Sequence, residues 1–208
     1  MPRVIGVDSS TQSCKVLVVD VASGEILSEA TTPHPEGSEI DPEYWWSALR
    51  NSLDQVDTSG VEAISIGAQQ HGLVALDARG VVLRPALLWN DTRSAPQAER
   101  LIAEFGAANL AERTGSVPVA SFTSTKLAWV REHEPHLART IAAVALPHDW
   151  LTWRLRGFGP AGSSVHGPQL DELVTDRSDA SGTGYFSSAT NTYDNDILDF
   201  VLGHRPVL

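Results

Sequence analysis

The chain begins with three short runs of β-branched and apolar residues that are separated by small polar residues. Two of these runs, Arg3 to Asp8 and Cys14 to Asp20, flank a polar loop, and a turn at residues 22–24 leads to the third, Glu25 to Thr31. Runs of this kind bounded by Ser, Gly and Asp are typical of strands joined by hairpin turns. The pattern therefore predicts that the chain opens as a three-stranded meander.

The next segment carries the signals of an amphipathic helix. Asp41 is a favourable N-cap, and Pro42 suits the first helical position. Apolar residues then recur at helical spacing, namely Trp45, Ala48, Leu49, Leu53 and Val56. We expect this stripe to lie on the sheet. A further strand is predicted over Val61 to Gly67, and it ends directly at a polar segment, residues 69–72.

From residue 73 onward the pattern predicts a mixture of short strands and helices. The elements expected are a hairpin of Leu73–Asp77 with Val81–Leu83, helices between Ser94 and Pro135, a strand over Ile141–Leu146 and a helix over Pro147–Arg156. Residues 157–170 are rich in Gly and Pro without periodicity, which predicts a flexible surface insertion. That segment contains the spacing Gly-x-Gly-x-x-Gly, but a dinucleotide site would need a strand before it and a helix after it. We therefore expect no dinucleotide there.

Composition and charge narrow the function classes. The chain has 208 residues, with 15 Lys and Arg against 26 Asp and Glu, and a net charge of −11. Its basic residues are scattered, so a nucleic-acid backbone is not expected as a partner. The single cysteine, Cys14, excludes an internal disulfide. The first residues do not form the apolar region of a signal peptide, and no apolar run is long enough to span a bilayer, so we expect a cytoplasmic protein without a membrane partner.

The loop after the first strand carries candidate chemistry. The hydroxyl groups of Ser10 and Thr11 and the ammonium group of Lys15 could surround a phosphate, while Asp8 could hold or orient a metal ion. A solvated hairpin turn is the more common structure for such a polar loop. A lone histidine at a strand end, as His71 is, is likewise more often a core residue bonded to the backbone. The residues alone leave these alternatives open.

Six segments, taken together and in this order, resemble the motifs of a known enzyme family. They are Gly6–Thr11 with Lys15, Gln69–Gly72, Leu88–Arg93, Thr125–Trp129, His148–Gly157 and Asp176–Thr183. This set is similar to the FGGY carbohydrate kinases, especially those that phosphorylate xylulose, over nearly the whole chain. The resemblance implies an α/β fold of the actin-like, ribonuclease H-like ATPase class, in which a mixed sheet opening with a three-stranded meander is flanked by helices. It also implies that residues 1–208 form the amino-terminal lobe of a two-lobed protein.

The resemblance assigns the first loop to the phosphates of ATP. Asp8 is expected to be important for activity and to lie near a Mg²⁺ ion, while Ser10, Thr11 and Lys15 are expected to bind phosphate. Ser9 and Ser10 stand where many members of the family have another residue and Gly. A serine in that place would narrow the approach of the phosphate, although the backbone could still present its N–H groups.

The resemblance assigns two other segments to the sugar. Gln70 and His71 are expected to contact it, and a neutral imidazole can both donate and accept a hydrogen bond. Asn90 and Asp91 are expected in a polar loop on the sugar side. An ion pair between Asp91 and Arg93 that fixes this loop would explain the same residues equally well.

Other residues of the motifs are expected to have structural roles. Four tryptophans lie among aliphatic residues, so core packing rather than sugar stacking is predicted for Trp89, Trp129, Trp150 and Trp153. Asp176 and Asp179 match a family segment next to the sugar site. Asp-rich turns are commonly helix caps, however, and neither residue is predicted to be catalytic.

The resemblance implies a reaction in which ATP and D-xylulose give ADP and D-xylulose 5-phosphate, with Mg²⁺ at the phosphates. In the family the general base lies beyond the last matched motif, so it is expected after Leu208, together with a second lobe supplied in cis or in trans. The 208-residue chain alone is therefore expected to be inactive, and an apolar face left exposed would favour a homodimer. The alternatives are a kinase lobe for another ketose or polyol, and a non-catalytic sugar-binding module.

Overall fold

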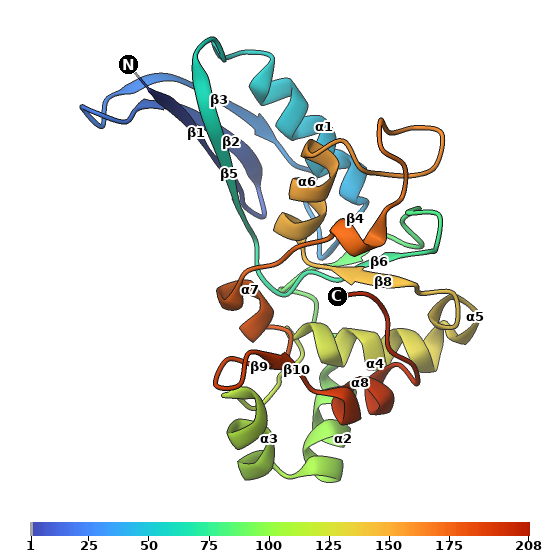
Figure 1. The fold of residues 1–208 in the computed structure, drawn as a ribbon. Coiled ribbons are helices and arrows are strands. Elements are labelled where there is room, and N and C mark those ends of the chain that lie inside the picture. Colours follow the sequence, from blue (N-terminus) through green and yellow to red (C-terminus); the bar gives the residue numbers. More distant parts are fainter. Residues whose placement is uncertain (1) are drawn as a thin grey trace.

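The computed structural model describes residues 2–208, which form two parts packed against each other. In the view of Figure 1 the upper part is a sheet with helices on one of its faces, and the lower part is built mainly of helices. Short paired strands lie between the two parts. Each part has its own group of buried apolar residues, one centred on the sheet and one on the helices.

The sheet contains the strands that the sequence pattern predicted. They are β1 (Arg3–Ser9), β2 (Ser13–Asp20), β3 (Ile26–Pro33) and β5 (Val61–Ala68), in the order β3-β2-β1-β5. The first three form an antiparallel meander, while β5 pairs with β1 in parallel. The sheet is therefore mixed, which confirms the predicted α/β fold class and its opening meander.

The connection between β3 and β5 contains helix α1 (Pro42–Leu53). The carboxylate of Asp41 accepts a hydrogen bond from the backbone N–H of Glu43 at 3.0 Å, so the predicted N-cap is present. The indole of Trp45 and the side chain of Leu49 are fully buried against the sheet. Because parallel strands need such a crossover, this helix is what brings β5 beside β1.

The register of the sheet determines which side chains lie where the parallel strands β1 and β5 end. Ile5 and Val7 of β1 point into the core, so the intervening Gly6 and Asp8 lie on the open face. Asp8 stands opposite Lys15 of β2 and beside Gly67 of β5. The ends of three adjacent strands thus meet around Asp8.

The predicted hairpin forms between the two parts of the molecule. Val82 bridges Leu76, and the backbone N–H groups of Asp77 and Leu83 donate to the carbonyl oxygens of Val81 and Ala75. In addition, β6 (Val74–Leu76) makes a ladder with β8 (Ala143–Ala145), which the sequence pattern did not predict. All six residues of β6 and β8 are buried, whereas residues 81–83 are partly exposed. Burial of apolar surface on both strands therefore stabilises this longer-range pairing beside the hairpin. A second pair joins β4 (Glu39–Ile40) to β7 (Ala86–Leu87).

The lower part is formed by the second half of the chain. Its elements are α2 (Ala95–Phe105), α3 (Ala107–Thr114), α4 (Thr123–His133), α5 (Pro135–Ala138), α7 (Arg177–Ser181), β9 (Phe186–Ser187), β10 (Thr192–Tyr193) and α8 (Asn195–Val201). Helix α4 packs against α2, α5 and α8 and is the centre of this group. None of the helices described in residues 2–208 is long and apolar enough to pass through a bilayer.

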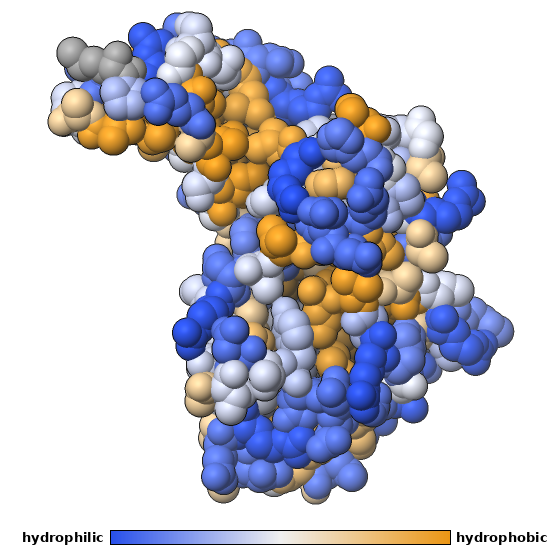
Figure 2. Space-filling model, viewed as in Figure 1, coloured by the Kyte–Doolittle hydropathy of each residue, from blue (hydrophilic) through white to orange (hydrophobic). Residues whose placement is uncertain are grey.

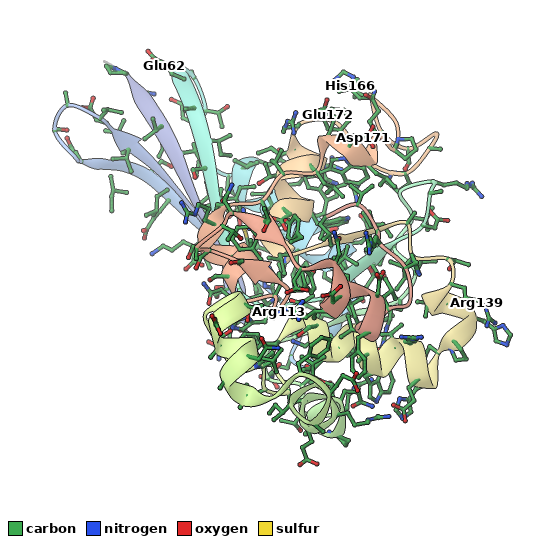
Figure 3. The ribbon with its side chains drawn as sticks, turned by 60° about the horizontal axis from the view of Figure 1, so that its bottom comes forward. Glu62, Arg113, Arg139, His166, Asp171 and Glu172 are labelled. Carbon is green, nitrogen blue, oxygen red and sulfur yellow. The ribbon has the colours of Figure 1, made fainter. Side chains whose placement is uncertain are left out.

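Helix α6 (Pro147–Leu155) returns to the upper part and is followed by the Gly- and Pro-rich segment. The predicted helix is confirmed, and residues 157–169 contain no helix or strand before the short 3₁₀ turn η1 (Leu170–Glu172). The indole N–H of Trp153 donates to the carbonyl oxygen of Gln169 at 3.0 Å and ties the loop down. Figure 3 shows His166, Asp171 and Glu172 gathered at one corner of the molecule. The glycines of residues 157–170 follow helix α6, whereas a dinucleotide-binding fingerprint must follow a strand, so this segment does not form such a site.

Candidate functional site

A pocket of about 420 Å³ lies where the parallel strands β1 and β5 end. Its lining consists of Asp8, Ser10, Thr11, Ala68, Gln69, Gln70, His71, Trp89 and Ser121. Ligands of open α/β sheets commonly bind beyond the carboxyl ends of such strands. Of the eight residues predicted to bind ligands, Asp8, Ser10, Thr11, Gln70 and His71 line this pocket. Lys15, Asn90 and Asp91 do not.

Asp8 presents an exposed carboxylate at the end of β1. Among residues 2–208 no hydrogen-bond donor or cation pairs with this side chain. The cationic neighbour in the register, Lys15, is turned toward β3, where its Nζ lies 3.4 Å from Oε2 of Glu29. Asp8 is therefore free to bind an incoming ligand.

The hydroxyl groups of the loop after β1 are not equivalent. Oγ of Ser10 donates to the carbonyl oxygen of Ser13 at 3.1 Å and closes the loop. Oγ1 of Thr11 instead accepts a hydrogen bond of 2.9 Å from Nε1 of Trp89. The hydroxyl proton of Thr11 is thus available to a phosphate, whereas that of Ser10 must first leave Ser13.

The ring of His71 is held in one orientation by contacts with two segments distant in sequence. The backbone of His71 has φ +66°, a left-handed conformation that is uncommon for a residue other than Gly. Its Nδ1 lies 2.8 Å from the carbonyl oxygen of Gly182, and its ring stacks on Phe122 at 5.0 Å. A carbonyl oxygen can only accept, so Nδ1 carries the proton and Nε2 has a lone pair. Burial lowers the pKa of His71, so the ring is neutral near pH 7.

Gln69 is a candidate ligand-binding residue that we did not predict from the sequence. Its side chain is 8% exposed and lines the pocket, and neither end of its amide has a hydrogen-bond partner among the described residues. A buried amide without partners costs free energy, which a ligand with hydroxyl groups would recover. The only signal in the sequence was its position in the run Gln-Gln-His-Gly.

Trp89 corrects one of the structural predictions. Trp150 and Trp153 are fully buried in the core, as predicted, but Trp89 is 48% exposed and forms part of the pocket lining. Trp129 is half-buried, with the guanidinium of Arg93 over its ring. Trp89 follows the buried strand β7 and the buried Leu88, so its apolar neighbours in sequence made it resemble a core residue.

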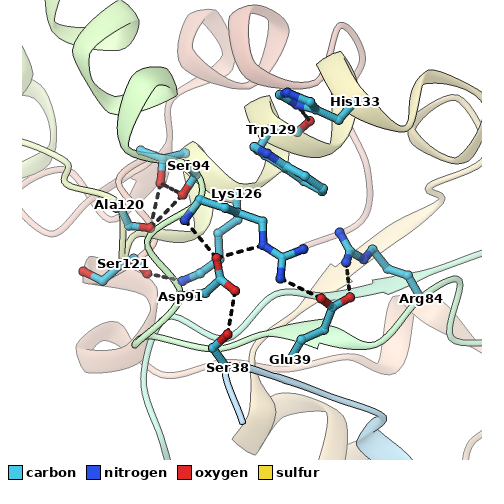
Figure 4. A network of polar contacts seen from close by, with 12 residues as sticks. Ser38, Glu39, Arg84, Asp91, Ser94, Ala120, Ser121, Lys126, Trp129 and His133 are labelled. Carbon is cyan, nitrogen blue, oxygen red and sulfur yellow. Dashed lines mark hydrogen bonds and ion pairs between the residues drawn. The ribbon is translucent and has the colours of Figure 1, made fainter.

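Asp91 and Asn90 are engaged within the protein. Asp91 is buried, and its carboxylate accepts hydrogen bonds from Oγ of Ser38 at 2.9 Å and from Nε of Arg93 at 2.9 Å (Figure 4). Burial alone would raise the pKa of Asp91, but the hydrogen bonds from Arg93 and Ser38 outweigh it and keep the pKa below its usual value. The amide of Asn90 donates to the carbonyl oxygen of Gly37 at 3.3 Å. These contacts match the alternative in which the loop is fixed by an ion pair.

Helix α7 is attached next to the pocket. Asp176 is its N-cap and accepts a hydrogen bond from the N–H of Asp179 at 2.9 Å, so the predicted cap is confirmed. The carboxylate of Asp179 in turn contacts Nδ1 of His148 at the start of α6. Because Gly182 ends α7 and binds His71, the position of α7 affects the position of the histidine ring.

The residues of the pocket suit a metal ion that binds together with a phosphate group. They do not form a metal site from protein side chains alone. In the part of the chain that the structure describes, no three His, Cys, Asp or Glu side chains form a group able to hold a metal. Mg²⁺ is commonly bound through one or two carboxylates together with phosphate oxygens and water. Asp8 supplies a carboxylate to the pocket lining, which fits binding of this kind.

A comparison with protein families matches residues 3–205 to the amino-terminal domain of the FGGY family of carbohydrate kinases. The xylulose kinase of Streptomyces coelicolor is 54% identical over 204 residues, which are 95% of this chain and 40% of the relative. The xylulose kinase of Escherichia coli is 36% identical, and 39% of its length is covered. The chain thus spans about two fifths of the length of these relatives.

The solved structures give the same result. The crystal structure of xylulose kinase from Bifidobacterium adolescentis superposes with a TM-score of 0.92 and 45% sequence identity, covering 97% of this chain and 43% of that one. A xylulose kinase from Rhodospirillum rubrum has a TM-score of 0.81 at 27% identity. The likeness extends over both the sheet and the helical part, because nearly the whole chain is covered.

Proposed function

This chain belongs to the FGGY family of carbohydrate kinases, and from that premise we propose that it is the amino-terminal lobe of an ATP-dependent D-xylulose kinase. The observation that supports this most directly is the pocket at the ends of β1 and β5. There Asp8 and Thr11 come from one strand end, and Gln69 and His71 come from the other. A phosphate-binding loop and a hydroxyl-binding loop are thus combined in one pocket.

The sugar side of the pocket suits an uncharged polyhydroxy compound. Nε2 of His71 accepts a hydrogen bond from a hydroxyl group, and the free amide of Gln69 can both donate and accept. The residues that line the pocket include no Lys or Arg, so no cation of the lining favours a sugar that carries a carboxylate. Trp89 adds an exposed aromatic ring that can pack against the carbon skeleton.

The phosphate side of the pocket would hold Mg·ATP. We assign Asp8 to the metal ion. The hydroxyl group of Thr11 donates a hydrogen bond to a phosphate oxygen. The metal ion, when bound, neutralises charge on the phosphate oxygens. We also propose phosphate contacts for Ser10 and Lys15, which require Lys15 to leave Glu29.

The proposed reaction transfers the γ-phosphoryl group of ATP to the terminal hydroxyl group of the ketose. The hydroxyl oxygen forms the new bond to phosphorus, the bond between that phosphorus and the leaving ADP oxygen breaks, and the hydroxyl proton passes to a general base. Asp8 is the single carboxylate in the pocket lining and is assigned to the metal. We therefore propose that the base belongs to the part of the relatives that this chain does not span.

The experiment that tests this function uses the chain alone and the chain completed by a relative. Fusion at Leu208 to the remaining part of the 54% identical xylulose kinase of Streptomyces rubiginosus supplies a second lobe. We expect the chain alone to bind D-xylulose without turnover, and the fusion to release ADP only when D-xylulose is added. Phosphoryl transfer depends on positioning across a closed cleft, so half of the cleft loses most of the rate.

The control is Asp8→Asn in the fusion, which should lower the rate of ADP release by about 100-fold or more, as for other electrostatic groups of active sites. Another ketose, glycerol and gluconate are tested beside D-xylulose. Preferential turnover of one of them would replace the assigned substrate. A folded fusion that binds the sugar but never releases ADP would instead identify a sugar-binding module.

A further inference from the structure

Lys126 is a fully buried lysine beside the pocket. It lies in the first turn of α4, is 0% exposed and forms no ion pair with a carboxylate of residues 2–208. Its ammonium group donates to two backbone carbonyl oxygens, that of His71 at 2.9 Å and that of Ser121. Figure 4 shows the lysine reaching Ser121 beside the Asp91 network.

Burial of this ammonium group is unfavourable for the fold. Removing it from water lowers the pKa of Lys126 to about 7, against a smaller opposite effect of the Asp91 charge. An apolar side chain at this position would avoid the cost of burying a charge. What distinguishes the lysine is therefore its hydrogen bonds to the two carbonyl oxygens.

The two carbonyl groups belong to two different walls of the pocket. His71 follows β5, Ser121 precedes α4, and both line the pocket, whereas Lys126 itself does not. The carbonyl oxygen of His71 also accepts a hydrogen bond of 3.3 Å from Oγ1 of Thr123. The peptide group of His71 is thus fixed on one side by α4, while Gly182 and Phe122 fix its ring.

We propose that Lys126 is a positioning residue for sugar binding, which joins the His71 and Ser121 loops through one buried ammonium group. It keeps the uncommon backbone conformation of His71, so that Nε2 of the ring presents its lone pair to the ligand. This inference rests on the proposed function, because it takes the ligand to be a neutral sugar whose hydroxyl group donates a hydrogen bond to Nε2 of His71.

The test is Lys126→Met, which keeps the apolar stem and removes the two hydrogen bonds. We expect the dissociation constant for D-xylulose, measured by calorimetry, to rise at least tenfold, while the melting temperature does not decrease. The NMR signals of the His71 ring should also shift in the absence of sugar, because its backbone is released. A lower melting temperature with unchanged affinity would show a purely structural lysine and overturn the inference.

Arg139→Met is the matched control, since it also removes a cation but is exposed at the periphery of the molecule (Figure 3) and does not line the pocket. It should leave both the affinity and the His71 signals unchanged.

If the wild-type chain does not bind D-xylulose, the proposed function fails, and the His71 ring signals in Lys126→Met still decide the inference: unchanged signals overturn it. If Lys126→Met does not fold, the ammonium signal of wild-type Lys126 is followed instead. It should shift when D-xylulose is added, and a constant signal overturns the inference.

Discussion

Gly182 leaves just enough room for the ring of His71. A Cβ atom built on Gly182 would lie 2.4 Å from both Cε1 and Nδ1 of that ring. The backbone of Gly182 has φ −80°, so any residue could adopt its conformation. The glycine is therefore required for space and not for backbone freedom.

We predict that Gly182→Ala weakens D-xylulose binding at least tenfold, because the ring of His71 must move away from its carbonyl partner. The overall free energy of unfolding should change by about 1 to 3 kcal/mol at most, as for other overpacked sites. Isothermal titration with D-xylulose measures the affinity, and urea unfolding measures the stability.

Gly6→Ala is the matched control for this substitution. A Cβ atom on Gly6 would meet no atom within 4 Å, and its backbone is likewise not in the left-handed region. The affinity of the Gly6→Ala protein for D-xylulose should equal that of the wild type. Unchanged affinity in a folded Gly182→Ala protein would show that His71 does not contact the sugar.

At the scale of elements, the contact between α6 and α7 depends on the protonation of His148. Burial alone would lower the pKa of His148, but the hydrogen bond to Asp179 and the charges of Asp149 and Asp176 outweigh it, so the pKa is raised. A raised histidine pKa stabilises the folded state fully below its unfolded value of 6.5, and this contribution is lost as the pH rises through the folded value.

We predict that the stability advantage of the wild type over His148→Gln decreases as the pH rises from about 6 to about 9. A hydrogen bond to a charged group contributes about 1.5 to 3 kcal/mol, and we expect the advantage to fall by an amount of this order. Urea unfolding at a series of pH values measures the difference. His136→Gln, at an exposed position in α5, should show no such trend. A pH-independent advantage for His148 would mean that its charge does not hold α7.

At the scale of the whole molecule, the sheet has an open edge. Strand β5 ends the order β3-β2-β1-β5 and has no second neighbour among residues 2–208. Beside it lies a groove that contains Ile64, Ile66 and Leu155, and Ile64 is 38% exposed. Figure 2 shows hydrophobic side chains gathered over this side of the sheet. Open apolar edges are where other chains add.

We predict that the 208-residue chain associates with itself at high concentration, and that Ile64→Lys shifts its mass toward the 22.4 kDa of one chain. A charge on an edge strand opposes the addition of another chain. Sedimentation velocity over a range of concentrations measures the mass. Val81→Lys, with the same 38% exposure at a turn, is the control. Identical association of both variants would exclude this edge as the interface.

Regular local patterns made much of the fold predictable from the sequence. The meander, the N-cap of α1 at Asp41 and the strand β5 follow from periods and caps within a few residues, and these signals do not depend on distant parts of the chain. The same holds for the positions of Asp8 and His71 at the ends of strands. The turn at residues 77–81 was also local, but the ladder partner of β6 lies about 70 residues further along the chain and was not predictable.

The sequence by itself thus determined the α/β class, the order of the elements and the loops that carry the candidate chemistry. Only the tertiary structure decided which of these groups meet. Gln69 is left without a partner, Trp89 is half-exposed, and Lys126 is buried at the carbonyl of His71, because segments far apart in sequence pack there. The contact between His71 and Gly182 spans 111 residues. Periodicity encodes which face of an element is apolar, whereas a contact of that range depends on how all the intervening elements pack.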